Sequence, residues 1–488
     1  MSMTRPSFPG RRSTCWPRAA AKGLGAATLL FLAVNVAGCS PDRLFGTSLP
    51  PNIPDPGLTH TAAGAVAAYY GALVLFRGAV GGNQNSYIPV SGLFADELGA
   101  PPQFVGAFSE KLLVDSRDLP DGYLGTINSD AYSGLQTARG QAQEAIGLLR
   151  AYDPDSLALI GHLDVLRGYT EVYLADLYCS GVPLSTLDYN GDYTAKPGST
   201  TEQVYTAAAA LFDSAAALAA DSTRILNAAR VGEGRVQLAL GNYAAAAQAV
   251  AAVPDRFQYA LHFSDVIGTS QAPGGSLPNV NFTWFDFESG RGDLLVTMVN
   301  SEGGNGLPFL SSGDPRTPWV ANGGISDNGA PLLRPANLDS VSSIVLASGV
   351  EARLIQAEGA LHSGDPSWLT ILNTLRTDGT YDTVGTDTLW HAGTGGVAGL
   401  APLADPGMES PRVDLLFHER GFWLFLGGQR QGDLRRLVRQ YGRQSTSAYP
   451  SGFYPGAKGS YGTEVSLPIP PAEQSSNPLF TGCLSHGA

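Results

Sequence analysis

The chain has 488 residues and a formal net charge of −13 at pH 7. This acidic balance argues against a nucleic-acid partner and against electrostatic binding to anionic lipid, because both need clustered Lys and Arg. With 43% hydrophobic and 15% charged residues, the composition is that of a globular protein, while 60 glycines and 33 prolines predict long loops.

The first 38 residues have the pattern of a lipoprotein signal peptide. Five basic and no acidic residues precede Cys39, and an apolar run of 14 residues covers positions 24–37. This pattern indicates export, and the run is shorter than the roughly 20 residues of a membrane span. Val36-Ala37-Gly38 predicts cleavage before Cys39 and acylation of its thiol. An ordinary signal peptide with a chance cysteine is the alternative.

Cleavage before Cys39 removes five positive charges and changes the net charge from −13 to −18. We therefore expect the membrane to be reached through lipid alone, and stable anchoring takes more than one acyl chain. An inner-membrane retention signal has aspartate directly after the acylated cysteine, whereas this chain has Ser40. We therefore expect the protein to be anchored in the outer membrane and to face the cell surface. Residues 39–60, with prolines at 50–56, are expected to form the lipid anchor and an extended spacer.

Two cysteines, Cys179 and Cys483, remain after cleavage and acylation. Because exported proteins fold in an oxidising compartment, we predict a disulfide between them. Two free buried thiols are the alternative. A metal-binding pair is less favoured, because only His486 lies near either cysteine.

Residues 61–488 are predicted to form a single, mostly helical domain. The early helices are expected at residues 61–76, 129–149, 159–177 and 201–220. Two apolar stripes run along residues 159–177, which predicts a helix sandwiched between neighbours. Residues 268–335 and 379–462 are rich in Gly, Pro, Ser and Asn, and we expect them to form the loops of a binding region.

Two later segments have the arrangement of a tetratricopeptide unit, in which two helices flank a short turn. In the first, residues 229–240 and 243–253 flank Gly241-Asn242; in the second, residues 354–361 and 368–375 flank Gly364-Asp365. Short strands are possible near residues 294–299 and 465–469. The predicted fold is therefore mostly α, a tetratricopeptide-like helical scaffold with long loops and minor short strands.

Five motifs together resemble the SusD/RagB family of surface lipoproteins. They are the helix that runs into Gly181-Val182-Pro183-Leu184, Asp314-Pro315-Arg316, residues 351–358 (EARLIQAE), residues 419–436 from Glu419-Arg420 to Arg435-Arg436, and Leu467-Pro468-Ile469-Pro470 followed by Glu473 and Asn477-Pro478. Residues 419–436 also have a structural interpretation, because opposite charges at helical spacing can pair within a buried scaffold. We favour that interpretation over ligand contacts for these charges.

The sequence predicts no catalytic centre and no cofactor. It contains no Gly-x-Ser-x-Gly elbow, His-Glu-x-x-His motif or Walker loop, and its seven histidines have no ligand spacing that would predict a metal site. We therefore expect a protein that is not an enzyme. An extracytoplasmic hydrolase would need a catalytic cluster assembled in space.

Aromatic residues in loops are the best candidates for ligand contacts, since rings stack on the apolar faces of sugars while Asn and Arg bond hydroxyls. The candidates are Tyr87 and Asn85 in an early Gly-Asn loop, Trp284, Phe285 and Arg291 after Pro278, and Trp319. The family resemblance implies a groove in these two regions. Rings that only fasten the loops to the scaffold are the alternative.

The resemblance implies a surface protein that binds glycan or another oligomeric nutrient and delivers it to a TonB-dependent outer-membrane transporter. The rival hypothesis is a tetratricopeptide-type adaptor that holds envelope proteins together without a small ligand. The sequence does not distinguish polysaccharide from peptide.

Overall fold

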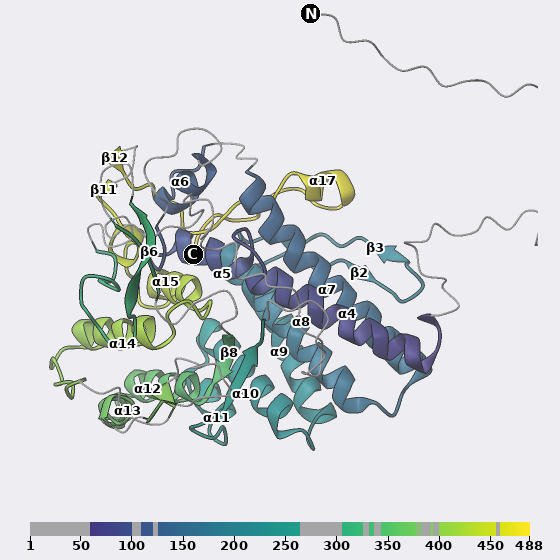
Figure 1. Cartoon of the computed structure of the whole chain (residues 1–488), viewed down its shortest axis with the longest axis horizontal. Helices are drawn as coiled ribbons and strands as arrows, with labels where there is room; N and C mark the ends of the chain where they lie inside the picture. Colours follow the sequence, from purple (N-terminus) through teal and green to yellow (C-terminus); the bar gives the residue numbers. More distant parts are fainter. Residues whose placement is uncertain are drawn as a thin grey trace, which may run out of the picture. The chain divides into compact units, whose positions relative to one another are not determined.

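The protein is mostly helical, as predicted (Figure 1). The computed structural model describes residues 59–99, 109–120, 125–263, 305–325, 331–335, 343–377, 380–381, 392–393, 400–454 and 459–488. Within these ranges there are fourteen helices, α4 to α17, and six short antiparallel strand pairs. The predicted signal peptide and spacer up to residue 58 lie outside the described residues.

Four long helices pack against one another and supply much of the core (Figure 1). They are α4 (Ala62–Gly81), α7 (Thr126–Tyr152), α8 (Leu157–Leu177) and α9 (Thr201–Leu218). Helix α7 contacts α4 and α8, and α8 contacts α9. Because α8 has neighbours on both sides, almost its whole surface is buried, which explains its two apolar stripes.

Two helix-turn-helix pairs follow, as the sequence predicts. Helices α10 (Thr223–Ala239) and α11 (Tyr243–Ala249) form the first pair, and α12 (Gly349–Ser363) and α13 (Ser367–Thr377) form the second. Their turns contain Gly241 and Gly364 with φ of 79° and 75°, a conformation that glycine adopts without strain. Helix α11 packs on α12, so the two pairs are neighbours in space although they are far apart in sequence.

The remaining helices complete the body. They are α5 (Tyr87–Phe94), α6 (Ser109–Ser116), α14 (Glu409–Trp423), α15 (Arg430–Arg439), α16 (Ser445–Ala448) and α17 (Ala472–Ser476). Helix α15 contacts α5 and α8, while α14 contacts α12. The α14–α15 segment therefore connects the long helices to the second helix pair.

The strands are short and form separate antiparallel pairs. They are β1 (Val182–Pro183) with β4 (Gly198–Ser199), β2 (Thr186–Leu187) with β3 (Tyr193–Thr194), β5 (Gln258–Leu261) with β8 (Ile344–Ser348), β6 (Trp319–Ile325) with β7 (Pro331–Pro335), β9 (Thr380–Tyr381) with β10 (Ala392–Gly393), and β11 (Phe453–Tyr454) with β12 (Gly459–Ser460). The expected strand at 465–469 is wrong, because only Leu467 forms an isolated bridge, to Tyr178. The possible strand at 294–299 lies outside the described residues.

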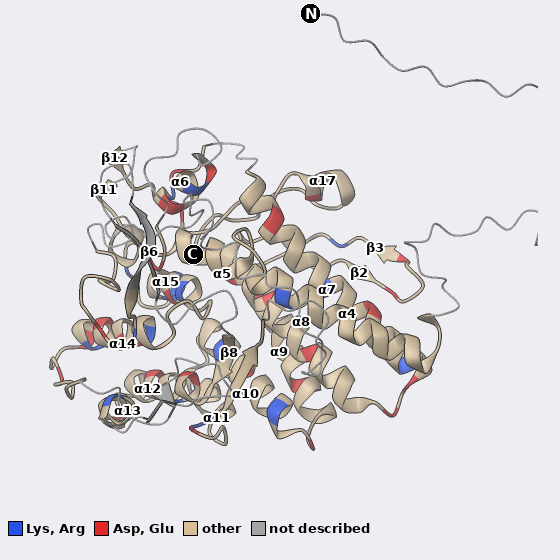
Figure 2. Ribbon diagram, viewed as in Figure 1, with Lys and Arg blue, Asp and Glu red and all other residues tan. Residues whose placement is uncertain are grey.

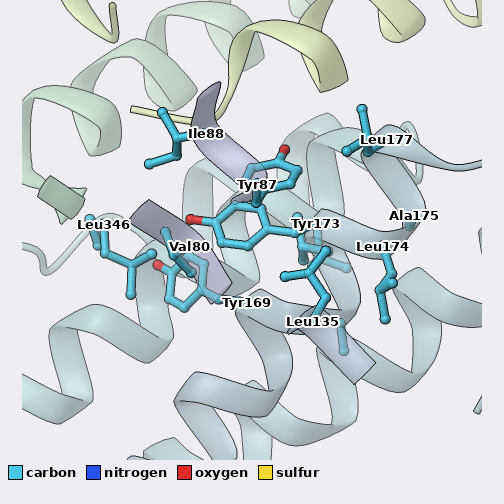
Figure 3. Close-up of a cluster of buried hydrophobic side chains, with 14 of the residues drawn as sticks. Val80, Tyr87, Ile88, Leu135, Tyr169, Tyr173, Leu174, Ala175, Leu177 and Leu346 are labelled. Carbon is cyan, nitrogen blue, oxygen red and sulfur yellow. The ribbon is translucent and has the colours of Figure 1, made fainter. Parts of the chain in front are cut away.

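Three tyrosines lie in the core beside α5 and α8 (Figure 3). The rings of Tyr87 and Tyr173 stack with centroids 3.9 Å apart, and the hydroxyl of Tyr169 donates to the carbonyl oxygen of Ala228 at 3.0 Å. A buried tyrosine is stable when its hydroxyl has a partner. The Tyr87 hydroxyl meets this condition by donating to the carbonyl oxygen of Gly428 at 2.9 Å.

The predicted disulfide is present and joins Cys179, after the end of α8, to Cys483 near the C-terminus, with a Cα–Cα distance of 5.8 Å. Backbone bonds reinforce the join, because Leu484 N–H donates to the carbonyl of Ser180 at 2.7 Å. Arg435 Nη2 also donates to the carbonyl of Gly487 at 3.0 Å. The C-terminal segment is therefore fastened to the core.

Among the described residues, α4 alone is long and apolar enough to cross a membrane by length and composition. Figure 2 shows almost no charged residue along it. Its Tyr69, Leu73 and Phe76 are buried, and α4 packs on α7 and α8. The helix therefore has the contacts of a core helix.

Two glycines allow α8, α9 and α10 to approach closely. A Cβ built on Gly168 would lie 2.7 Å from the Phe212 ring, and one on Gly232 would lie 2.4 Å from it. The same edge of the Phe212 ring therefore lies against both glycines.

We predict that Gly232→Ala destabilises the protein by about 1–3 kcal/mol through overpacking. The control is Gly71→Ala in α4, where a Cβ would meet nothing within 4 Å. That change should stabilise the helix by roughly 0.5–1 kcal/mol. Urea unfolding of the two variants would measure the difference, and equal midpoints would contradict the packing argument.

Candidate functional site

A buried ion network holds α12, α14 and α15 together. Arg420 donates to both carboxylate oxygens of Asp433 at 2.8 and 2.9 Å, and Arg436 donates to Asp433 at 2.8 Å. Arg436 also makes two bonds to Glu358, which accepts a third from the hydroxyl of Tyr441 at 2.8 Å. Burial opposes ionisation of Asp433, but the two guanidinium groups lower its pKa to about 2.

A second network fastens the segment that precedes β6. Arg316 donates to Glu419 at 2.8 Å and to Asp314 at 2.8 Å, and Arg376 donates to Glu419 at 2.7 Å. Burial of Glu419 acts to raise its pKa, yet the bond with His418 and the charges of Arg316 and Arg376 lower the pKa to about 2. Glu419, Arg420, Asp433 and Arg436 therefore pair within the scaffold, but only Asp433 and Arg436 do so at the helical spacing that the sequence suggests; the other pairs join different segments.

Beside these networks lies a surface that we call the loop surface, made by residues 305–319 and 446–454 (Figure 1). Asn305 Nδ2 donates to the carbonyl oxygens of Tyr449 and Thr446 at 2.6 and 3.2 Å, which joins the two segments. Phe453 in β11 is 72% exposed, the largest exposed fraction among the described large hydrophobic residues. An exposed ring can stack on the apolar face of a sugar.

Trp319 also lies on the loop surface, and its ring is partly buried. Its Nε1 donates to the carbonyl oxygen of Phe309 at 3.1 Å, and its ring meets Phe425 edge-on with centroids 5.8 Å apart. The ring therefore fastens the start of β6 to α14 and its following turn, while its remaining exposed part is open to a ligand.

The other predicted ligand contacts differ in where they lie and how far they are exposed. Tyr87 is a correction, because it begins α5 rather than lying in a loop, and its ring is 0% exposed. Burial against Tyr173 leaves it no surface for a ligand. Asn85 is partly buried, and its Nδ2 donates to Asp130 at 2.8 Å. Trp284, Phe285 and Arg291 lie outside the described residues.

Phe453 is a candidate that the sequence-based predictions missed. Residues 445–462 are expected to form a loop, but no ring in that loop is among the predicted ligand contacts. The signal is the pair Phe453-Tyr454, which stands between Gly452 and Pro455 in a segment with few other large apolar residues. Of this pair, Tyr454 is buried and Phe453 is exposed, a division that the sequence does not predict.

The described side chains contain no group of three or more His, Cys, Asp or Glu residues that could hold a metal ion.

Comparison with known proteins supports the fold. No family model matches the sequence. No curated protein matches it either. Among solved structures, a SusD superfamily protein from Bacteroides thetaiotaomicron has a TM-score of 0.62 at 15% identity, covering 87% of this chain and 99% of that chain. A laminarin-binding SusD-like protein has a TM-score of 0.58 at 15% identity, covering 87% of this chain and 98% of that one.

NanU from B. fragilis has a TM-score of 0.55 at 13% identity, covering 90% of this chain and 100% of that chain. The similarity spans nearly the whole of each solved structure. The chain therefore has the SusD-like fold, which agrees with the five motifs found in the sequence.

A buried carboxyl near the networks makes stability depend on pH. Burial raises the pKa of Glu97 from 4.5 to about 8, although a hydrogen bond from Leu426 N–H at 2.7 Å favours the charged form. Between these pH values the folded protein holds this proton and the unfolded chain has lost it. Stability contributed by Glu97 is therefore lost as the pH rises from 4.5 to 8.

We predict that Glu97→Gln, which removes the charge and keeps an acceptor for Leu426, gains stability relative to the wild type as the pH rises. The gain should be at most about 1.4 kcal/mol per pH unit within the window. Urea unfolding at pH 5 and pH 8 would measure it. Parallel changes in the two proteins would show that Glu97 does not titrate in this range.

Proposed function

We propose that this protein is a lipid-anchored, surface-exposed member of the SusD/RagB family that binds glycan. The observation that carries the proposal is the SusD-like fold, which covers 87% of the chain in the match to a protein described as laminarin-binding. A SusD-like carbohydrate-binding protein from Bacteroides vulgatus matches 77% of the chain at a TM-score of 0.51. The ordered SusD/RagB motifs add independent support from the sequence.

The glycan would bind at the loop surface together with the segment that carries Trp284, Phe285 and Arg291. Rings lose little conformational entropy on binding and present apolar faces to the C–H faces of sugars. The ion networks that fasten residues 314–316 support this role, because a rigid base reduces the entropy lost when a ligand binds. Asn85 remains a proposed ligand contact, with its amide bonded to Asp130 of α7, whereas Tyr87 is omitted because it is buried.

The bound glycan would pass to a TonB-dependent outer-membrane transporter, which would supply the energy for uptake. In this proposal the protein captures its ligand passively and has no catalytic role. Cys39 and its acyl chains would tether the body to the outer membrane, and residues 39–60 would let it move over the transporter. A net charge of −18 after cleavage supports a tether that depends on lipid and not on basic side chains.

We predict that Trp284→Ala and Trp319→Ala each weaken binding of laminarin oligosaccharides or another glycan found by array screening. Loss of a stacking ring should cost about 1 kcal/mol, or roughly fivefold in Kd. Calorimetry on a lipid-free chain that starts at Ser40 would measure the affinity.

The control is Tyr70→Ala, which removes a 41% exposed ring from α4. It should leave affinity unchanged, and melting temperatures would identify any loss of folding in the Trp319 variant. If the protein bound no glycan or peptide, the adaptor hypothesis would be favoured instead.

We also predict that Cys39→Ala abolishes retention at the cell surface and leaves glycan affinity unchanged, because the tether and the ligand site are separate. Fractionation and surface labelling of cells would test retention. A Cys39→Ala protein that stays in the outer membrane would mean that the transporter, and not lipid, holds it there.

A further inference from the structure

A second surface feature is a cleft of about 470 Å³ between one face of α7, the β2–β3 hairpin and α17. It is separate from the loop surface, since no residue of 305–319 or 446–454 lines it. Its volume lies within the roughly 300–1,000 Å³ of small-molecule sites. Its lining includes Gln136, Arg139, Gly140, Gln141, Tyr193 and Glu473.

Arg139 is held in a fixed position at this cleft although it is only 4% exposed. Its Nε donates to Gln136 Oε1 at 3.0 Å, and its Nη2 donates to the carbonyl oxygen of Ser185. Nη1 makes no hydrogen bond to the described chain, and it is not among the fully enclosed atoms. A guanidinium fixed at two nitrogens thus presents a preoriented donor to the cleft.

Glu473 supplies a matching acceptor on α17. Its Oε2 accepts from the hydroxyl of Tyr132 at 3.0 Å, and its Oε1 accepts from Asn477 Nδ2 at 3.1 Å. Each carboxylate oxygen has capacity for a further bond. Gln141 similarly donates its amide to Glu144 at 2.8 Å, which leaves its Oε1 as an acceptor.

The charges of Arg139 and Glu473 balance, so the cleft favours a neutral ligand over an anion. Tyr193 adds a ring that is 53% exposed. Fixed donors, fixed acceptors and one open ring match a sugar unit, which has hydroxyls around its rim and C–H groups on its faces.

Gly140 lines the cleft and offers a position from which a side chain can fill it. A glycine inside a helix costs about 1 kcal/mol relative to alanine. Packing explains Gly147, where a Cβ would lie 2.9 Å from the Tyr189 side chain, whereas at Gly134 a Cβ would make only an ordinary contact, 3.6 Å from Ala79. At Gly140 a Cβ would meet nothing within 4 Å. A side chain there would enter the cleft without striking the scaffold.

We propose that the cleft formed by α7, the β2–β3 hairpin and α17 is a second site, which binds one short neutral sugar unit. The class of ligand in this inference rests on the proposed glycan function. The location of the site rests on the cleft alone. A sugar unit held here would occupy a site separate from the loop surface, so that a single chain could hold two sugars at once.

The test is Gly140→Leu, which should fill the cleft. Calorimetry on the lipid-free chain would use the methyl glycosides of glucose, galactose, mannose and N-acetylglucosamine, with glucuronate as the anionic comparison. We expect at least one neutral glycoside to bind and its affinity to fall at least tenfold in Gly140→Leu. Tyr193→Ser, a change of an exposed ring, should reduce the same affinity several-fold without affecting folding.

Two controls keep this result distinct from the proposed function. Gly71→Leu also adds a side chain at an open glycine inside a helix, and it should leave glycoside binding unchanged. Trp284→Ala should weaken oligosaccharide binding and spare the glycosides. Wild-type glycoside affinity in Gly140→Leu, stronger binding of glucuronate, or no glycoside binding would overturn the cleft site while leaving oligosaccharide capture intact. Failure of every glycan, long or short, would overturn both.

Discussion

The paired charges of Arg420, Asp433, Arg436 and Glu358 are the constraint on which this fold depends. All four side chains are at most 5% exposed. Taking an ion out of water is costly, and only close pairing offsets that cost; a partner left alone costs about 3–5 kcal/mol. Because these residues belong to α12, α14 and α15, an arrangement of the helices that separated the pairs would leave charges buried and unpaired.

The same constraint fixes the segment between α14 and α15. Its Leu426 and Gly428 have φ of 54° and 83°, and a Cβ at Gly428 would lie 2.9 Å from the Tyr87 ring. The carbonyl of Gly428 accepts the bond from the Tyr87 hydroxyl. The turn between α14 and α15 has ion-paired helices on both sides, and its Gly428 contacts Tyr87, which stacks on Tyr173. This contact explains why a glycine stands at 428 and why Tyr87 has no exposure.

Periodicity was enough to predict the long helices and both helix-turn-helix pairs, because each depends on local spacing of apolar residues. It could not predict that α11 packs on α12, since that contact joins distant segments. Tyr87 was misassigned because Asn83 to Ser86 has loop composition and α5 is too short for a clear period. Sequence alone also could not show that Phe453 is exposed and Tyr454 is buried, because the tertiary neighbours of each ring decide its exposure.

The position of α17, which forms one wall of the cleft, also depends on residues outside the helix. This five-residue helix has no buried residue of its own, so packing does not hold it. Besides the bond from Tyr132 to Glu473, two attachments in the C-terminal tail hold it in position. Asn477 is 0% exposed and donates to the carbonyl of Lys196 at 2.8 Å, and the Cys179–Cys483 disulfide lies six residues further along the chain. Glu473 is therefore held at the cleft from two sides, by Tyr132 of α7 and by Asn477 of the tail. Because the disulfide fastens the same tail, it supports this wall of the cleft as well as the C-terminal segment.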